Sequence, residues 1–177
     1  MPTIDPQRSL LLVIDIQTRL MPAIHDGESV IRNAGRLIEA TKLIGVPRLF
    51  TEQNPKGLGP TVDAIAVEPG RLVEKQSFDV CREAGFLDRV PADAHVVVAG
   101  CEAHVCVLQT VLGLRAAGRD VYVAADAIGS RAPANREAAL RRMERHGAEA
   151  VTTEMVVFEW LQTALHPQFR SAAALIK

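Results

Sequence analysis

The sequence predicts a single α/β domain of three layers, in which a doubly wound, mainly parallel sheet of about six strands lies between two layers of helices. Short runs of apolar and β-branched residues alternate with longer segments of helical periodicity along the 177 residues. Those short runs are apolar throughout, which is typical of parallel strands covered on both faces. No linker, repeat or low-complexity tract divides the chain, so we expect one domain over residues 1–177.

The first half of the chain predicts three strands and one long helix. Residues 9–14 form a strand that is apolar on both faces, and residues 29–44 form an amphipathic helix. A second strand follows at 47–51 and a short third strand at 71–74. The segment 54–60 is rich in proline and glycine, and we expect a loop there.

The second half repeats the alternation of helix and strand. Glycines stand directly after two of its predicted helices, where they can adopt the left-handed conformation that ends a helix. The predicted elements are a brief helix at 83–90, the strongest strand at 95–99, a helix from 102 or 103 to 117, a strand at 121–124, a helix at 135–146, a strand at 150–152 and a helix at 155–165.

Composition excludes several classes of partner. Hydrophobic residues make up 48% of the chain and charged residues 23%, which is typical of a soluble globular protein. The formal net charge of -1 and the aromatic content of 4% give no cationic or base-stacking surface for nucleic acid, and no attraction to an anionic membrane. We therefore expect a small-molecule substrate, with neither nucleic acid nor membrane as partner.

The cysteines and the apolar runs predict a cytoplasmic protein. No apolar run is long enough to span a bilayer, and the run at 10–14 is too short for the core of a signal peptide. The three cysteines, Cys81, Cys101 and Cys106, are an odd number without the spacing of a zinc site. A disulfide framework is not expected from such a set.

Three chemically distinct side chains follow the predicted strands. Asp15 comes directly after the first strand, with Gln17 beside it, and Lys75 follows the third. The strongest strand leads through Gly100 into the segment from Cys101 to Cys106. Ligands of a doubly wound sheet bind beyond the carboxyl ends of its strands, so a carboxylate, an ammonium and a thiol should share one edge.

These groups fit nucleophilic catalysis by a cysteine. The free N–H groups of a helix start favour a thiolate, so we expect ionisation of Cys106 to be assisted. Asp15 could accept the thiol proton and return it to a leaving amine, and Lys75 could stabilise the thiolate. Cys106 would attack an acyl carbon and form a thioester, and backbone N–H groups at the helix start would bind the oxyanion.

Each residue also has a structural explanation. An aspartate after a first strand often caps a helix, and a lysine at a strand end is usually a solvated charge. A buried cysteine is more often a small apolar residue, which is our interpretation of Cys101. Glu52 either lines the site or caps its loop, and Asp126 favours a structural turn. His104 stands two residues before Cys106, so the two side chains do not face each other on a helix.

The chain resembles the isochorismatase-like cysteine hydrolase superfamily over nearly its whole length. The motifs are Leu11 to Gln17, Lys75 to Phe78, Gly100 to Val107 with Thr110, and Val123 to Ala127. The resemblance implies a catalytic triad of Asp15, Lys75 and Cys106. It also implies a cis peptide between Cys101 and Glu102, an oxyanion hole made by the N–H groups of Glu102 and Cys106, and a homo-oligomer, a dimer or larger.

The chain departs from common family patterns in two places. Ala103 stands where many members carry threonine. Nicotinamidases bind a metal through histidines after the second strand, whereas residues 51–59 contain none here. We therefore expect no metal and no cofactor, in the branch of the superfamily without an assigned substrate. Gln17, Glu52, Phe78 and His104 are candidates for the pocket wall.

Three functions remain open from sequence. The first is a metal-independent cysteine hydrolase that acts on a small amide or related acyl C–N bond. The second is a non-catalytic binding or assembly module, in which the apolar run at 172–176 could pack on a neighbouring subunit. The third is redox sensing by Cys106, with Cys101 as its disulfide partner.

Overall fold

The computed structural model describes residues 3–177 and has one sheet of six strands in the order β3-β2-β1-β4-β5-β6. All neighbouring strands pair in parallel, which confirms the predicted three-layer α/β/α class. The strands are β1 (Ser9–Ile14), β2 (Arg48–Gln53), β3 (Leu72–Lys75), β4 (His95–Cys101), β5 (Asp120–Gly129) and β6 (Glu149–Val151).

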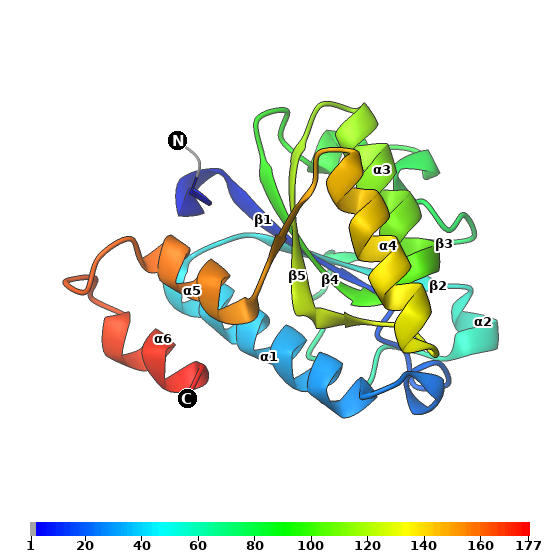
Figure 1. The fold of residues 1–177 in the computed structure, drawn as a ribbon, viewed down its shortest axis with the longest axis horizontal. Helices are drawn as coiled ribbons and strands as arrows, with labels where there is room; N and C mark the ends of the chain where they lie inside the picture. Colours follow the sequence, from blue (N-terminus) through cyan, green and yellow to red (C-terminus); the bar gives the residue numbers. More distant parts are fainter. Residues whose placement is uncertain (1–2) are drawn as a thin grey trace.

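The helices separate into two groups on either side of the sheet (Figure 1). α1, α5 and α6 pack together on one side, and α3 and α4 pack together on the other. The helices are α1 (Gly27–Ile44), α2 (Pro55–Leu58), α3 (Leu108–Ala116), α4 (Pro133–Arg145), α5 (Thr153–Leu161) and α6 (Phe169–Leu175). A π-helical turn, η5 (Ala103–Val107), leads into α3.

Two apolar cores explain why the strands are apolar on both faces. In β1, Leu11 and Val13 point into the core that α1, α5 and α6 cover, whereas Leu10 and Leu12 point into the core beneath α3 and α4. Successive strand residues face opposite sides, so a strand between two helical layers needs apolar residues at every position. All six residues of β1 are buried.

The strand order changes direction at β1: β2 and β3 are added on one side of it, and β4, β5 and β6 on the other. β1 pairs with β2 on one side and with β4 on the other, so a crevice opens beyond the carboxyl ends of β1 and β4. Gly100 faces the backbone of Ile14 with φ +125°, where a Cβ would collide with the Ile14 carbonyl. Glycine is therefore required for β4 to pass this close to the end of β1.

Several predicted elements differ from the structure. The helix predicted at 83–90 is wrong: two short 3-10 turns, η3 (Val80–Arg82) and η4 (Leu87–Arg89), flank Gly85, whose φ of +74° interrupts a helix. The loop predicted at 54–60 contains the single turn α2. The strand predicted at 121–124 continues through Asp126 to Gly129.

The carboxyl-terminal part of the chain is more ordered than the sequence pattern indicates. The helix predicted at 155–165 ends at Leu161, and α6 follows it. Ala172 of α6 is fully buried in the core that α1 covers. The side chain of Asp126 accepts hydrogen bonds from the N–H (2.8 Å) and the hydroxyl (3.0 Å) of Thr153, so its role at the start of α5 is structural.

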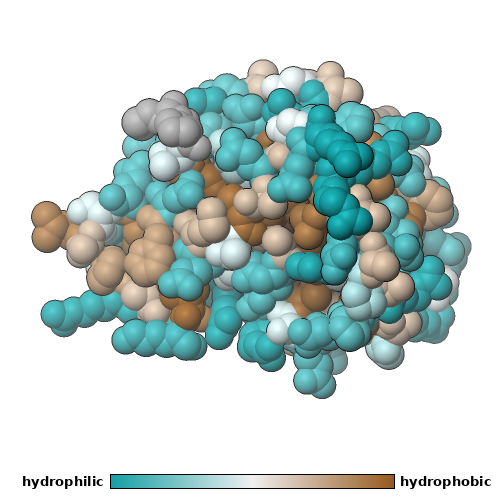
Figure 2. Space-filling view, viewed as in Figure 1, coloured by the Kyte–Doolittle hydropathy of each residue, from teal (hydrophilic) through white to brown (hydrophobic). Residues whose placement is uncertain are grey.

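The surface in Figure 2 is mostly hydrophilic, with teal side chains over the outer face of α4, brown areas near the middle of the view and paler brown ones toward the end that carries the α5–α6 loop. The exposed large apolar side chains there are Met155, Phe158 and Leu165. In residues 3–177 no helix combines the length and the apolar character that crossing a membrane requires.

Candidate active site

A buried ion pair joins the ends of β1 and β3. Lys75 Nζ lies 2.7 Å from Asp15 Oδ2, and neither side chain is exposed to solvent. Asp15 directly follows β1 and has φ +50°, in the left-handed region that aspartate tolerates better than most residues. The two residues are distant in the sequence but meet because the carboxyl ends of parallel strands lie at one edge. The predicted proximity of Asp15 and Lys75 is therefore present in the structure.

Two residues of β2 complete the hydrogen bonds of this pair. The Thr51 hydroxyl donates to Asp15 Oδ1 at 2.5 Å, and Lys75 Nζ donates to Gln53 Oε1 at 2.9 Å. A buried ion pair needs such partners, because its charges have lost their water. Thr51 and Gln53 were not predicted as site residues, although both lie on β2, the strand between β1 and β3.

Cys106 lies on η5, in the crevice beyond β4, and is 6% exposed. Burial and, to a smaller extent, the charge of Asp15 raise the pKa of its thiol to about 12, and Lys75 acts in the opposite direction. Desolvation therefore opposes the ionisation that the sequence predicts for a thiol at a helix start. The thiol is neutral at pH 7, and the carboxylate of Asp15 is the nearby group that could accept its proton.

The backbone before η5 has the geometry expected from the resemblance. The Cys101–Glu102 peptide bond is cis. The Glu102 carbonyl accepts hydrogen bonds from the N–H groups of Val105 (3.0 Å) and Val107 (3.2 Å). Within residues 3–177, no acceptor takes a hydrogen bond from the Glu102 N–H itself. This donor is therefore free to bind an oxygen atom of a ligand.

The loop between β5 and α4 holds the segment around Glu102 in place. Glu102 Oε2 accepts hydrogen bonds from the N–H and the Nε of Arg131, each at 3.0 Å. Two residues along the chain, His104 Nδ1 lies 3.0 Å from Ser130 Oγ. Both contacts tie the segment near Cys106 to the loop between β5 and α4.

A cavity of about 350 Å³ opens beside these groups. Its wall combines ionisable side chains with apolar ones, and Cys106 and Asp15 are both part of it. Lys75 contributes through its ion pair with Asp15. The lining residues are Asp15, Arg19, Leu20, Ala23, Gln53, Leu58, Phe78, Glu102, Val105, Cys106 and Arg131.

The predicted wall residues divide into two groups. Phe78 lines the cavity and is 49% exposed. Gln17, Glu52 and His104 lie outside its lining. Gln17 is buried and donates to the backbone carbonyls of Gln53 and Gly59. Glu52 accepts hydrogen bonds from Thr61, which agrees with a role in fixing its loop.

The two thiols near this site belong to different cores. Cys101 packs in the core beneath α1, and Cys106 packs in the core beneath α3. Burial raises the pKa of Cys101 to about 12, and the structure contains Cys101 and Cys106 as free thiols. Their separation by the sheet does not favour a disulfide between them.

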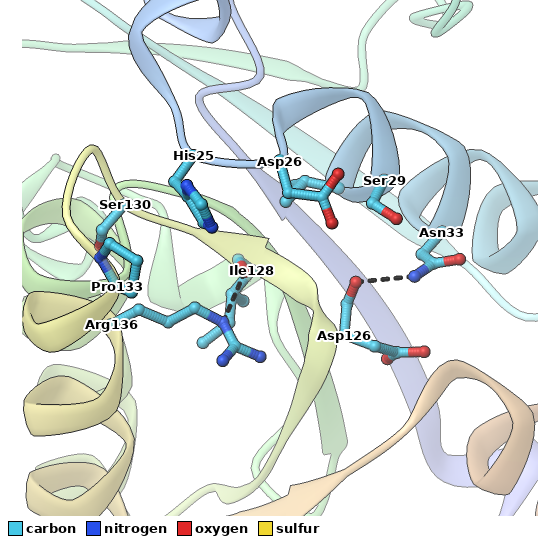
Figure 3. Close-up of a pocket in the computed structure, with 10 residues that line it drawn as sticks. His25, Asp26, Ser29, Asn33, Asp126, Ile128, Ser130, Pro133 and Arg136 are labelled. Atoms are coloured by element: carbon cyan, nitrogen blue, oxygen red, sulfur yellow. Dashed lines mark hydrogen bonds between the residues drawn. The ribbon is translucent and has the colours of Figure 1, made fainter.

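A second cavity, of about 370 Å³, lies between the start of α1, the end of β5 and the start of α4 (Figure 3). Several of its polar groups already bind the backbone: Asn33 donates to the Asp126 carbonyl at 2.7 Å, and Arg136 Nε donates to the Ile128 carbonyl at 3.1 Å. These contacts hold α1 and α4 to β5. None of the three predicted catalytic residues lines this cavity.

No group of three or more His, Cys, Asp or Glu side chains in residues 3–177 is arranged to hold a metal ion. The groups that meet at the first cavity include the buried carboxylate of Asp15 with its Lys75 partner, the thiol of Cys106 and the backbone of the Glu102 segment. This combination suits acyl chemistry at a sulfur nucleophile.

Comparison with known proteins agrees with this architecture. The family model described as Isochorismatase domain matches residues 9–155. Isochorismatase domain-containing protein 2 of Danio rerio is 35% identical over 170 residues, which cover 95% of this chain and 86% of that protein. The structure of MAR1 ribonuclease from Caenorhabditis elegans is 34% identical, with a TM-score of 0.91 over 98% of this chain and 92% of that chain.

A more distant structure shares the fold. The YcaC gene product of Escherichia coli, described as an octameric hydrolase of unknown specificity, has a TM-score of 0.86 at 24% identity. The match covers 99% of this chain and 88% of that chain. The family model spans most of the described residues and the curated relative covers nearly all of them. The chain therefore belongs to the isochorismatase family, and it has the hydrolase fold of that family.

Proposed function

We propose that the protein is a cysteine hydrolase that cleaves a small amide or a related acyl C–N bond through a thioester. The observation that carries the proposal is the convergence of Cys106 and the buried Asp15–Lys75 pair on one cavity. Nucleophile, proton acceptor and charge partner come from the ends of three different strands or their following turns. A purely structural role does not require a fully buried carboxylate beside a thiol in a cavity wall.

The first half of the reaction forms the thioester. Asp15 accepts the proton of the Cys106 thiol as the sulfur attacks the acyl carbon, and a C–S bond forms. The carbonyl oxygen becomes an oxyanion, which the N–H groups of Glu102 and Cys106 bind. The C–N bond then breaks, and Asp15 returns the proton to the leaving nitrogen.

The second half restores the enzyme. A water molecule attacks the thioester carbon while Asp15 accepts one of its protons. The C–S bond breaks, the carboxylic acid leaves, and the sulfur regains its proton. Throughout the cycle Lys75 keeps the carboxylate oriented and offsets the negative charge that develops on sulfur, which the direction of its effect on the Cys106 pKa supports.

An amidase panel tests the proposal. The wild-type protein and the variants Cys106→Ala and Asp15→Asn are assayed for ammonia release from small primary amides, ureas and N-carbamoyl compounds. Hydrolysis by the wild type, with loss in both variants but not in Cys81→Ala, is the expected result. Turnover that survives in Cys106→Ala would overturn the cysteine mechanism.

The same panel separates the hydrolase from a binding module. A module without turnover would hydrolyse no compound but would still bind some of them in the cavity. Calorimetric titration of compounds that are not hydrolysed detects such binding. Binding in the absence of any hydrolysis would favour the module.

RNA is a control substrate in this panel, because the Caenorhabditis elegans relative is described as a ribonuclease. We do not extend that activity to this chain, since its formal net charge of -1 provides no excess of cations to neutralise a phosphate backbone. We propose instead that its partners are a small-molecule substrate in the cytoplasm and further copies of the same chain.

A further inference from the structure

The charges that line the Cys106 cavity cancel in two pairs. Lys75 neutralises Asp15 at 2.7 Å, and Arg131 Nε lies 3.0 Å from Glu102 Oε2. The thiol of Cys106 is neutral at pH 7, because burial raises its pKa to about 12. One charged side chain of the lining is left, the guanidinium of Arg19.

One nitrogen of the Arg19 guanidinium, Nη1, is hydrogen-bonded to the protein beside the cavity. Nη1 donates to the backbone carbonyls of Lys56 (3.2 Å) and Gly57 (3.1 Å), at the turn α2. Among residues 3–177, no carboxylate lies within ion-pair distance of Arg19, and its Nε and Nη2 groups donate no hydrogen bond. Arg19 is exposed to solvent, and its two hydrogen bonds at Nη1 hold the guanidinium at the rim of the cavity while Nε and Nη2 have no partner among residues 3–177.

This geometry suits a carboxylate. A planar guanidinium presents parallel N–H groups that match the two oxygens of a carboxylate, and such charge-assisted hydrogen bonds are stronger than neutral ones. Arg19 lies four residues after Asp15 on the same connection, and both residues line the cavity. An anion bound at Arg19 would share the cavity with Cys106.

The remaining wall limits the rest of the ligand. Leu20, Ala23, Leu58, Phe78 and Val105 contribute apolar surface. A cavity of about 350 Å³ is at the small end of ligand sites. The molecule that fits is short, with an uncharged linker between its two polar ends.

We propose that the substrate is a small amide that carries a carboxylate, which Arg19 binds while Cys106 attacks the amide carbonyl. This inference rests on the proposed function, because it assigns the substrate class of the same site. Arg19 acts as a specificity residue: it selects anionic over neutral acyl compounds and takes no proton during the reaction.

Alkylation of Cys106 by iodoacetate and by iodoacetamide tests this selection. The reagents have the same size and differ in charge, and in each reaction sulfur displaces iodide. Peptide mass spectrometry gives the two rate constants at Cys106. Their ratio does not depend on the thiolate fraction, because both reagents react with the same thiolate.

We expect Arg19→Gln to lower the ratio of iodoacetate to iodoacetamide rate constants by about five- to tenfold, as expected for losing one charge-assisted contact at a partly solvated site. Arg19→Lys should retain part of the preference. Arg141→Gln is the matched control, because Arg141 lies on the exposed face of α4, 3.8 Å from Glu137, and should leave the ratio unchanged. Salt should weaken the wild-type preference.

The outcomes separate the two proposals. If Cys106 is alkylated and the ratio is the same in wild type and Arg19→Gln, the anionic substrate class is wrong while the nucleophile stands. If hydrolysis of small amides survives in Cys106→Ala, the cysteine mechanism fails and the substrate class fails with it. Hydrolysis of succinamate but not of succinamide, lost in Arg19→Gln, would give independent support.

Discussion

Asp15 and Lys75 have opposite effects on the pKa of the Cys106 thiol, which Asp15 raises and Lys75 lowers. Their charges are separated by 2.7 Å in a region without solvent exposure, where desolvation is costly unless each charge has partners. Thr51 and Gln53 supply those partners. The pair therefore stabilises the fold only while both members are present, and its carboxylate opposes ionisation of the thiol next to it.

Replacing Asp15 by Asn should have opposite effects on the alkylation of Cys106 and on amide hydrolysis. The charge of Asp15 raises the pKa of Cys106, so its removal should lower the pH at which iodoacetamide labels this thiol. Hydrolysis should fall by about a thousandfold or more, because the proton acceptor is lost. Asp26→Asn, at an exposed position, is the control. Unchanged labelling and unchanged hydrolysis in Asp15→Asn would show that the carboxylate has no role in the reaction.

Breaking the buried pair from the other side should destabilise the protein. Lys75→Met leaves the Asp15 charge buried without its partner, and we expect the free energy of unfolding to fall by about 3–5 kcal/mol in urea titrations. Lys42→Met, which breaks the exposed pair with Glu39, should change it by less than about 1 kcal/mol. In the double variant with Asp15→Asn, the loss should be smaller than the sum of the single losses. An additive result would contradict coupling between the two residues.

The residues at strand ends were predictable, and those on loops were not. Asp15 and Lys75 follow apolar runs directly, so the rule for parallel sheets places them at one edge. Arg19 and Arg131 lie on connections whose path depends on tertiary contacts, such as the hydrogen bonds between Arg19 and the turn α2. The raised pKa of Cys106 was missed because burial cannot be derived from the position of a residue on a helix.

At the scale of elements, α6 is part of the core. Ala172 has no exposed surface and packs in the cluster that α1 covers, whereas Ala174 on the same helix is exposed. Ala172→Asp should therefore lower the free energy of unfolding by about 3 kcal/mol or more, because it buries a charge without a partner. Ala174→Asp has the same helix propensity cost of less than about 1 kcal/mol and no burial cost.

Urea unfolding of the two alanine variants measures the difference between them. Equal stabilities would mean that α6 is detached from the core in solution. The sequence pattern does not reveal this helix, since a segment of seven residues shows little periodicity. For the same reason the two 3-10 turns around Gly85 cannot be distinguished from a short helix by their composition.

At the scale of the whole molecule, the three thiols should make the free energy of unfolding fall at alkaline pH. Burial raises the pKa of Cys81, Cys101 and Cys106 above their ordinary value of 9.0. The unfolded chain therefore loses these protons at lower pH than the folded protein. The stabilisation is complete below about pH 9 and is lost as the pH rises toward 12, with a slope of about 1.4 kcal/mol per pH unit for each thiol.

Urea titrations at pH 7, 9 and 10 measure this slope. Cys101→Ala should remove the contribution of one thiol, so the free energy of unfolding should fall less steeply above pH 9. A variant that declines as steeply as the wild type would contradict the assignment of Cys101 to the effect. Lysine and tyrosine titrations contribute equally to both proteins, so the comparison isolates the thiol.

The sheet class was predictable for the whole molecule, and the assembly was not. Uniformly apolar strands joined by helices predict a parallel sheet with two covered faces, which the structure contains. The homo-oligomer stays a prediction, because the surface of one chain does not identify its partner. Sedimentation velocity of the purified protein gives its mass: a species larger than the 19.2 kDa chain is expected, and a monomer at micromolar concentration would contradict it.

The proposed mechanism requires a thioester to form on Cys106. Rapid mixing with p-nitrophenyl acetate, followed by acid quench and peptide mass spectrometry, measures it directly. We predict a burst of p-nitrophenol close to one equivalent per chain, with an acetyl group on the peptide that contains Cys106, and neither in Cys106→Ala. A burst of the same size in Cys106→Ala, or an acetyl group on a different residue, would contradict the mechanism.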